Sequence, residues 1–315
     1  MLSRTADSLF WASRYMERAE NTARVLDVAY RVSLAPGADA EAHGEWASVL
    51  AICGCEERFA ERHDGVSKRS VIEFMALDPD NPSSIYSSIR IARENARAER
   101  NNLTTDIWEA LNATWLEIRD MDYAVLAAYG FQKFFDWVKE RSHLIRGATM
   151  ATMLRDDTFN FTRLGTFIER ADNTARILDG KYHILLPQTE AVGGAVDYYQ
   201  WAALLRSVSA FRIYRRIYRD AVLPWRVAEL MILHGDMPRS LHFCLREITA
   251  NLDMLAEIYG ERHECHRLAG ELHARLRYGK VEQVFQEGLH EFLTDFIARN
   301  NRLAVEIGRN FLMTV

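Results

Sequence analysis

The sequence predicts an all-α fold, a helical bundle made of two sequence-related multi-helix halves in a pseudo-two-fold arrangement. Two observations carry this prediction. Apolar residues recur at three- and four-residue spacing along most of the 315-residue chain, whereas alternating runs of β-branched residues are nearly absent. The segment 17–27 also recurs as 169–179, with nine identities in eleven positions. The first observation indicates helices, and the second indicates a repeated unit.

The repeat continues beyond this segment, because Trp46-Ala47 recurs as Trp201-Ala202 at nearly the same offset. A period of about half the chain indicates two copies of a multi-helix unit rather than a solenoid of short repeats. We therefore expect related halves at about residues 1–150 and 151–315. No linker rich in Gly, Ser or Pro separates them, which favours a single compact domain over residues 1–315.

The first half predicts its helices in order. A helix with an apolar stripe follows an N-cap at Ser3 and ends near residues 34–37, where Pro and Gly occur. A second helix is expected from about Glu45 to Arg62, followed by a shorter one. Two prolines in the segment 78–82 then predict a turn, because each disfavours helix in the residue before it.

Ser83 or Ser84 is expected to cap the next helix. Asp106 with Glu109 resembles a capping box that opens a further helix, and another helix is expected from Phe131 to about Leu144. The second half should follow the same plan from about residue 156. Its breaks are expected near residues 187–194, at 224, around 235–238 and near 279, where Pro and Gly gather.

Composition and charge exclude several classes of protein. The chain is 49% hydrophobic and carries a net charge of −5, which excludes a disordered composition and gives no general reason to bind nucleic acid. The start lacks the basic and apolar regions of a signal peptide, and the longest apolar runs are too short to cross a bilayer. Four scattered cysteines indicate reduced thiols, so we expect a cytoplasmic protein with no role at a membrane.

A polar ridge on the first helix is the main candidate site. Arg14, Glu17, Asn21 and Arg24 fall on one helical face, and their counterparts in the second half are Thr166, Glu169, Asn173 and Arg176. Three of the four polar residue types occur in both ridges, although the residues of an ordinary solvated face could differ freely between the two copies. The ridges therefore carry a constraint.

Three explanations of the two ridges stay open. Glu and Arg of the repeated helices can pair across the pseudo-two-fold axis, with Asn completing a partly buried network. The ridges can instead bound a shared cleft for a carboxylate, a phosphate or a peptide backbone, because Arg offers a planar fork and Asn both donates and accepts. A carboxylate-bridged metal site is less favoured, since the Glu-x-x-His pattern of di-iron bundles is missing from both helices.

A basic stripe is the second candidate site. One helix, expected from Arg206 to Arg219, carries arginines interleaved with aromatic residues. They are Arg212, Arg215, Arg216 and Arg219. A solvated face balanced by acidic neighbours explains such a stripe, and so does a docking surface for an acidic partner or a phosphate.

Standard signatures of catalysis and metal binding are missing. Neither the segment 53–55 nor the segment 263–266 has the two-pair spacing of a zinc site, so their residues are interpreted as buried thiols and surface histidines. The chain has no Walker loop, no Gly-x-Ser-x-Gly elbow and no dinucleotide-binding glycine pattern. We expect no metal and no cofactor.

The opening of the chain resembles a known family. Residues 1–4 read MLSR, residues 9–11 read LFW, and residues 14–24 read RYMERAENTAR. Together with the segments 92–97, 108–112 and 238–240, these closely resemble the Alpha-E family of bacterial helical proteins, whose hallmark is a Glu-Arg helix. On the matching positions the hallmark falls on Glu17 and Arg18, and through the internal duplicate on Glu169 and Arg170.

The resemblance implies a context rather than a mechanism, because the family's function is largely uncharacterised. Its members are associated with circularly permuted ATP-grasp proteins and with transglutaminase-like or proteasome-related peptidases. The resemblance thus implies a system that makes, attaches or removes peptide-like units. A peptide-like ligand is also compatible with this context.

The leading hypothesis is a non-catalytic helical partner that binds a peptide, a tagged intermediate or the ATP-grasp protein itself. One alternative is an enzyme of the same system whose duplicated Glu and Arg residues perform acid-base or amide-bond chemistry in a shared cleft. A second alternative makes the Glu-Arg motif a purely structural brace.

Overall fold

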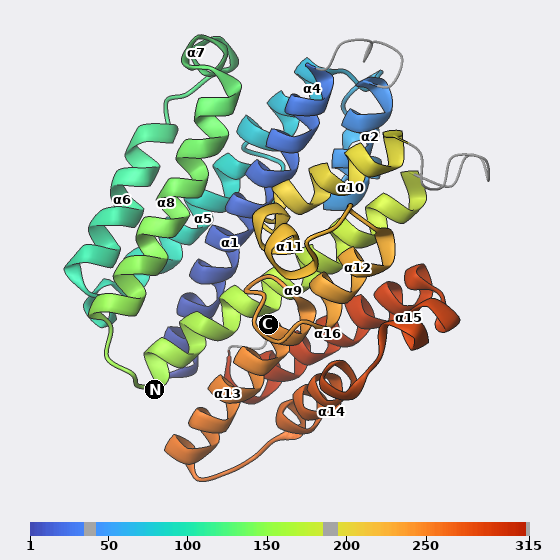
Figure 1. The fold of residues 1–315 in the computed structure, drawn as a ribbon. Helices are drawn as coiled ribbons and strands as arrows, with labels where there is room; N and C mark the ends of the chain where they lie inside the picture. Colours follow the sequence, from blue (N-terminus) through green and yellow to red (C-terminus); the bar gives the residue numbers. More distant parts are fainter. Residues whose placement is uncertain (35–41, 185–194, 313–315) are drawn as a thin grey trace.

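The computed structural model describes residues 1–34, 42–184 and 195–312. Within these ranges it contains sixteen α-helices and no strand, so the predicted all-α class is confirmed (Figure 1). The helix break expected at 34–37 lies mostly outside the described residues, and the break expected at 187–194 lies wholly outside them.

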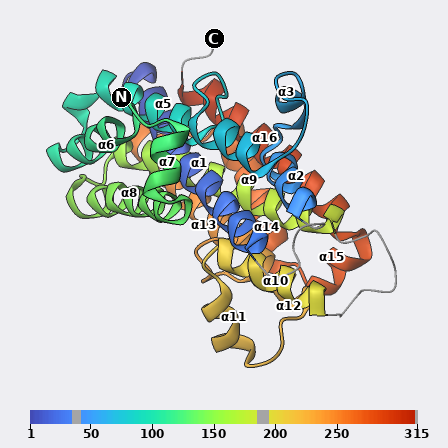
Figure 2. The same cartoon turned by 90° about the horizontal axis from the view of Figure 1, so that it is seen from above.

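Two long helices cross at the centre of the molecule. They are α1 (Ser3–Ser33) and α9 (Asp157–Ile184), drawn in blue and light green in Figures 1 and 2. Small residues let them approach closely, since Ala19 and Ala171 are fully buried. At Gly165 a Cβ atom would lie 2.1 Å from the carbonyl oxygen of Phe10, so only glycine fits this contact.

Helices α1 and α9 each pack against several further helices, and some of these contact both. Helix α1 packs against α2 (Ala42–Cys53), α5 (Ile85–Ala98) and α8 (Phe131–Thr152). The remaining helices before α9 are α3 (Glu56–Ala60), α4 (Lys68–Ile72), α6 (Thr105–Ile118) and α7 (Tyr123–Tyr129), with a π-helical turn η1 (Glu73–Leu77) and a 3-10 turn η2 (Arg100–Asn102).

Helix α9 packs in the same manner against α10 (Ala195–Ser207), α13 (Leu241–Tyr259) and α16 (Leu289–Phe311). The other elements after α9 are α11 (Phe211–Tyr218), α12 (Pro224–Ala228), η3 (Glu229–Leu233, a π-helical turn), α14 (Glu264–Tyr278) and α15 (Val281–Glu287). One continuous hydrophobic core joins both sets of helices. No helix among the described residues combines the length and apolar composition needed to span a membrane.

Helix caps match the sequence in one case and differ in two. The hydroxyl of Ser84 accepts a hydrogen bond from the amide of Ser87, which confirms the expected cap of α5. The expected cap at Ser3 is wrong, because Ser3 is itself the first helical residue. The capping box at Asp106 is also wrong: α6 begins one residue earlier, after Thr104, whose hydroxyl bonds the hydroxyl of Thr152 instead.

Two predicted helices are broken by residues with positive φ. The helix expected from Glu45 to Arg62 ends at Cys53, because Gly54 adopts φ +62° and redirects the chain. The helix expected from Arg206 to Arg219 is interrupted in the same way at Ser209, with φ 58°. Helix α8 also runs eight residues past Leu144, to residue 152, because it buries further side chains against the core.

Candidate functional site

The Glu-Arg motifs of α1 and α9 pair reciprocally at the helix crossing. Arg170 donates from Nε and Nη2 to the two carboxylate oxygens of Glu17, at 2.9 and 2.8 Å. Arg18 donates in the same way to Glu169, at 2.6 and 3.1 Å. Each carboxylate therefore receives a two-pronged guanidinium from the opposite helix, the strongest geometry for this pair.

Both motif carboxylates are buried and anionic. Glu17 is 1% exposed. Burial raises its pKa, but the cationic Arg170, Arg239 and Arg146 outweigh burial and bring the pKa to about 2. Burial likewise raises the pKa of Glu169, and Arg14 and Arg18 turn the net shift downward. Neither group exchanges protons near neutral pH.

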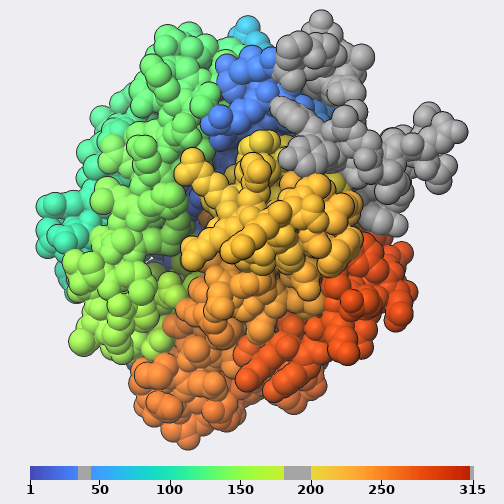
Figure 3. Space-filling model, in the orientation of Figure 1, coloured from blue at the N-terminus to red at the C-terminus, as the bar shows by residue number. Residues whose placement is uncertain are grey.

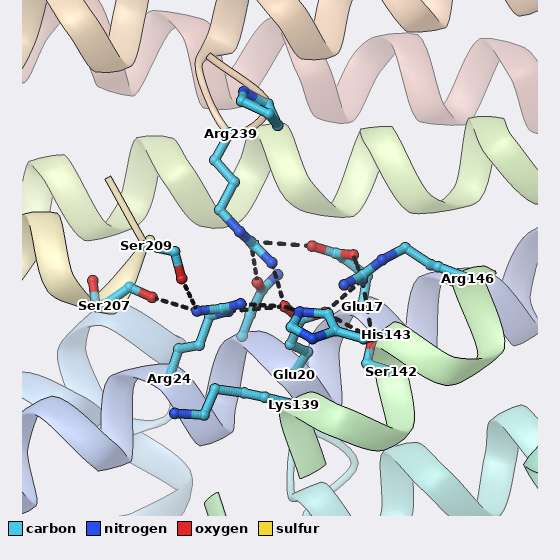
Figure 4. Close-up of polar contacts among 12 residues, drawn as sticks. Glu17, Glu20, Arg24, Lys139, Ser142, His143, Arg146, Ser207, Ser209 and Arg239 are labelled. Atoms are coloured by element: carbon cyan, nitrogen blue, oxygen red, sulfur yellow. Dashed lines mark hydrogen bonds and ion pairs between the residues drawn. The ribbon is translucent and has the colours of Figure 1, made fainter. Parts of the chain in front are cut away.

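Glu20 gathers a second set of partners one helical turn further along α1 (Figure 4). Its carboxylate accepts hydrogen bonds from Arg24 at 2.8 Å and from Ser142 of α8 at 2.7 Å. Arg146 of α8 and Arg239, which precedes α13, also donate to it. Burial raises the pKa of Glu20, but these cations hold it well below its usual range. Helix α8 and the turn before α13 are thereby joined to α1.

Arg24 ties this cluster to the end of α10. Its Nη1 donates to the carbonyl oxygen of Ser207 at 3.1 Å and to the hydroxyl of Ser209 at 2.9 Å (Figure 4). The positive φ of Ser209 turns the chain two residues after the end of α10.

Asn21 lies between the two motif pairs. Its side-chain oxygen accepts a hydrogen bond from Nη1 of Arg239 at 3.0 Å. Its side-chain nitrogen is buried and has no hydrogen-bond partner among the described residues. An unsatisfied buried donor is costly, so this nitrogen is a candidate contact for a ligand.

A polar pocket opens on the α9 side of the crossing, and we call it the Ser83 pocket. Its volume is about 220 Å³. The polar residues that line it include Arg18, Asn21, Ser83, Asp172, Asn173 and Arg176. Arg176 donates to one oxygen of Asp172 at 2.7 Å, whereas the other oxygen is buried without a hydrogen-bond partner in the described parts of the chain.

A larger, open pocket of about 440 Å³ lies between α1, α8 and α10. Figure 3 shows the surface hollowed between green α8 and yellow α10, with blue α1 in the floor. Arg24, Lys139, His143 and Arg206 are among its lining residues. Lys139 is paired with Asp27 at 2.9 Å, so part of this positive charge is already neutralised.

The predicted ridges are thus brought together at one crossing. Arg14 reaches Glu169 at 2.9 Å, whereas its counterpart Thr166 bonds the backbone of its own helix. Arg24 and Arg176 each pair with a carboxylate four residues earlier on the same helix, not across the crossing.

Sequence reasoning missed several partners in the site. Glu20 and Asp172 stood inside the duplicated segment, and their spacing to Arg24 and Arg176 was the available signal. Arg239 belonged to one of the segments that carry the family resemblance. Arg146 gave no signal, because it is distant in sequence and has no charged repeat counterpart that would mark it.

The basic stripe lies on α11 and just beyond it, away from the crossing. All four arginines, Arg212, Arg215, Arg216 and Arg219, are exposed. None of them has a partner in an ion pair within the residues that the structure describes. The nearest acidic residue in sequence is Asp220, which pairs with Arg226 at 2.9 Å. Both interpretations of the stripe, a solvated face and a docking surface, stay predictions.

The thiols and histidines form no metal centre in the described part of the chain. All four cysteines are free, and burial raises the pKa of Cys244 to about 12. The interpretation of His266 as a surface residue is wrong. It is 8% exposed, and its Nε2 lies 3.0 Å from the carbonyl oxygen of Leu252, so it serves the packing of α13 against α14.

Comparisons with known proteins agree with the helical architecture. The model of the Alpha-E family, described as a predicted alpha-helical domain with a conserved ER motif, matches residues 1–312. The chain is 26% identical over 320 residues to an uncharacterised protein of Mycobacterium bovis, covering 94% of this chain and 35% of that protein. An uncharacterised protein of Mycobacterium tuberculosis strain H37Rv is 25% identical over the same length and with the same coverage.

The chain therefore spans about a third of the length of the curated relatives it matches. No solved structure matches it. The family model covers nearly every residue and is described by a conserved ER motif, and Glu-Arg dipeptides of this chain pair at the helix crossing. The chain belongs to the Alpha-E family.

Proposed function

We propose that the chain is a non-catalytic helical binding protein in an ATP-grasp-linked system for peptide synthesis or protein modification. The observation that carries this proposal is the commitment of the motif Glu and Arg to one another, beside a polar pocket with unsatisfied groups. In this proposal the motif holds the two central helices together, and the pocket beside it binds.

The state of the motif carboxylates argues against the enzyme alternative. A general acid or base works best when its pKa lies near the operating pH. The pKa of Glu17 is about 2, and its two oxygens already accept hydrogen bonds from guanidinium groups. The enzyme alternative requires Glu17→Gln to abolish a turnover without loss of folding. The binding proposal expects a reconstituted system to keep its turnover in a folded Glu17→Gln variant.

The lengths of the relatives support an accessory role. In the mycobacterial proteins the matched region is about a third of a longer chain. A helical domain within a longer protein can bind a ligand or a partner while another domain of the same protein carries the catalytic activity. We propose that an ATP-grasp-type protein, with a transglutaminase-like or proteasome-related peptidase, supplies that activity. We place the system in the cytoplasm, in keeping with the free thiols.

We also propose that the halves 1–150 and 151–315 arose by duplication and are related by a pseudo-two-fold axis through the crossing. Corresponding backbone contacts support this. The hydroxyl of Thr22 donates to the carbonyl oxygen of Ser83 at 3.4 Å, and the hydroxyl of Thr174 donates to that of Arg239 at 2.9 Å. The π-helical turns η1 and η3 also precede the corresponding helices α5 and α13.

Copurification with a candidate circularly permuted ATP-grasp protein tests the proposal. We expect a stable complex, or saturable binding of a peptide from the same system. A complex that forms equally well with the folded Glu17→Gln variant supports a non-catalytic role. The proposal fails if the two proteins do not associate and no peptide binds at high micromolar concentration.

A further inference from the structure

Several corresponding residues line the two sides of the α1–α9 crossing, and one of the positions that differ holds Arg239 on one side and Ser83 on the other. Glu20 and Arg24 on one side correspond to Asp172 and Arg176 on the other, and both pairs form the same contact four residues apart. The position of Arg239 corresponds to that of Ser83, because each carbonyl oxygen accepts a hydrogen bond from an equivalent threonine hydroxyl. An arginine on one side thus faces a serine on the other.

Arg239 places its guanidinium group inside its own side of the crossing. The side chain is 8% exposed, and it donates to Glu20 and to the side-chain oxygen of Asn21 while lying 3.2 Å from Glu17 (Figure 4). The counterparts of these three acceptors are Asp172, Asn173 and Glu169, and all three line the Ser83 pocket. The side chain of Ser83 is too short to reach them as Arg239 does.

The Ser83 pocket has the hydrogen-bonding groups that such a guanidinium would need. One oxygen of Asp172 is buried and has no hydrogen-bond partner in the described residues, and it is the counterpart of the carboxylate that Arg239 contacts. The buried side-chain nitrogen of Asn21 is an unsatisfied donor, and it would donate a hydrogen bond to a carbonyl oxygen of the ligand. A guanidinium with an adjacent amide group matches both.

The charges around the two sides are consistent with this match. Besides the two carboxylates, the Arg239 side has the cations Arg24, Arg146 and Arg170, and it accommodates Arg239 as a fourth. The Ser83 side has two carboxylates as well, together with three arginines. They are Arg14, Arg18 and Arg176. The Ser83 side therefore holds one arginine fewer than the Arg239 side around the same number of carboxylates.

We infer that the Ser83 pocket binds a guanidinium-bearing ligand, an arginine side chain or a small arginine derivative, in the place that Arg239 fills on the opposite side. This inference rests on the duplication and binding role proposed above. Asp172 and Asn173 accept from the guanidinium, and the nitrogen of Asn21 donates to the ligand's amide carbonyl.

Titration of the full chain with L-argininamide tests the inference, with agmatine, a short arginine-containing peptide and acetate as parallel probes. We expect saturable binding of the argininamide, weaker binding of agmatine, which lacks the amide, and no binding of acetate. Tighter binding of the peptide than of argininamide would identify a peptide as the source of the side chain, and the reverse order a free arginine derivative. Absence of guanidinium binding, or preference for acetate, overturns the inference.

Two variants separate this pocket from other acidic surfaces. Asp172→Asn keeps the shape of the side chain and is expected to lower the affinity for argininamide about tenfold or more, because it removes a charged acceptor. Ser83→Arg supplies the guanidinium from the chain itself and is expected to abolish binding. Gln132→Arg adds the same charge at an exposed position of α8 and should bind as the wild type does. Unchanged affinity in Asp172→Asn or in Ser83→Arg overturns the inference.

A variant on the opposite side tests whether the place that Arg239 fills can bind a free guanidinium. Arg239→Ser removes the resident guanidinium, and argininamide or methylguanidine should then raise the melting temperature of the variant more than that of the wild type. An equal rise of the melting temperature in both proteins would contradict the inference that this place selects a guanidinium. If the wild-type chain forms the complex with the ATP-grasp-type partner but does not bind argininamide, this inference fails and the proposed function stands. If it binds argininamide but forms no such complex, the proposed partner role fails and this inference stands.

Discussion

Arg24 and Arg176 occupy matching positions in the repeat but have different surroundings. The Arg24 side chain is 7% exposed and bonds Glu20, Ser207 and Ser209. The Arg176 side chain is 35% exposed and, among the described residues, bonds Asp172 alone. Loss of a buried partner is costly because it leaves an uncompensated charge, while a part-exposed pair contributes little.

The first prediction follows from this difference. Arg24→Ala should lower the free energy of unfolding by about 3 to 5 kcal/mol. Arg176→Ala should lower it by less than about 1 kcal/mol. Urea unfolding of both variants, with the exposed Arg97→Ala as control, measures the effect. Equal losses at the two repeat positions would contradict the prediction.

Glu17 makes the stability of the protein depend on pH. Its pKa falls from the ordinary value of 4.5 to about 2 in the folded chain, so its contribution is fully present above pH 4.5. That contribution, about 3 kcal/mol by linkage, is lost as the pH falls from about 4.5 toward 2. Unfolding curves at pH 3 and pH 6 should show a smaller difference for Glu17→Gln than for the wild type. If the free energy of unfolding changes equally between pH 3 and pH 6 in both proteins, Glu17 does not cause the pH dependence.

At the scale of the elements, the crossing of α1 and α9 depends on one glycine. Gly165→Ala should destabilise the protein by about 1 to 3 kcal/mol or more, because the new methyl group meets the carbonyl oxygen of Phe10 and forces the helices apart. Gly147→Ala is the matched control, since Gly147 is exposed within α8 and a Cβ there meets nothing within 4 Å. The control should gain up to about 1 kcal/mol from helix propensity. A stable Gly165→Ala variant would mean that the helices are less tightly packed.

Helix existence could be predicted from the sequence far better than helix breaks. The apolar stripe located α1 because it reflects burial of one helical face, the serine cap located the start of α5, and the sequence repeat located α9. The break at Gly54 and the equivalent break at Ser209 were missed, since a single residue with positive φ leaves the surrounding periodicity unchanged. Ser209 is the harder case, because serine seldom adopts this conformation.

The candidate site was predictable only where it was duplicated. Repetition pointed to Glu17, Glu169 and their neighbours, but it could not indicate which guanidinium meets which carboxylate. The position of Arg239 depends on how α13 packs on α9, a tertiary contact between residues distant in sequence. Arg146 depends likewise on the packing of α8 on α1.

At the scale of the whole molecule, the exposed arginines of α11 provide a test of docking. If this face binds an acidic partner, the double variant Arg212→Glu/Arg216→Glu should weaken the complex and remove most of its dependence on salt. Copurification at low and high ionic strength measures the effect, and Arg97→Glu/Arg100→Glu, at exposed positions of α5 and η2, is a control of the same charge change. An unchanged complex in the α11 variant would exclude this face as the interface.

The reciprocal exchange between Glu17–Arg170 and Glu169–Arg18 has a consequence for the origin of the chain. A protein with only one copy of the unit would present one glutamate and one arginine of the motif without a mate. Two identical copies related by a two-fold axis would supply each other's missing mate through a self-complementary interface. If the halves arose by the proposed duplication, gene fusion would have turned a concentration-dependent pairing of two copies into an intramolecular one.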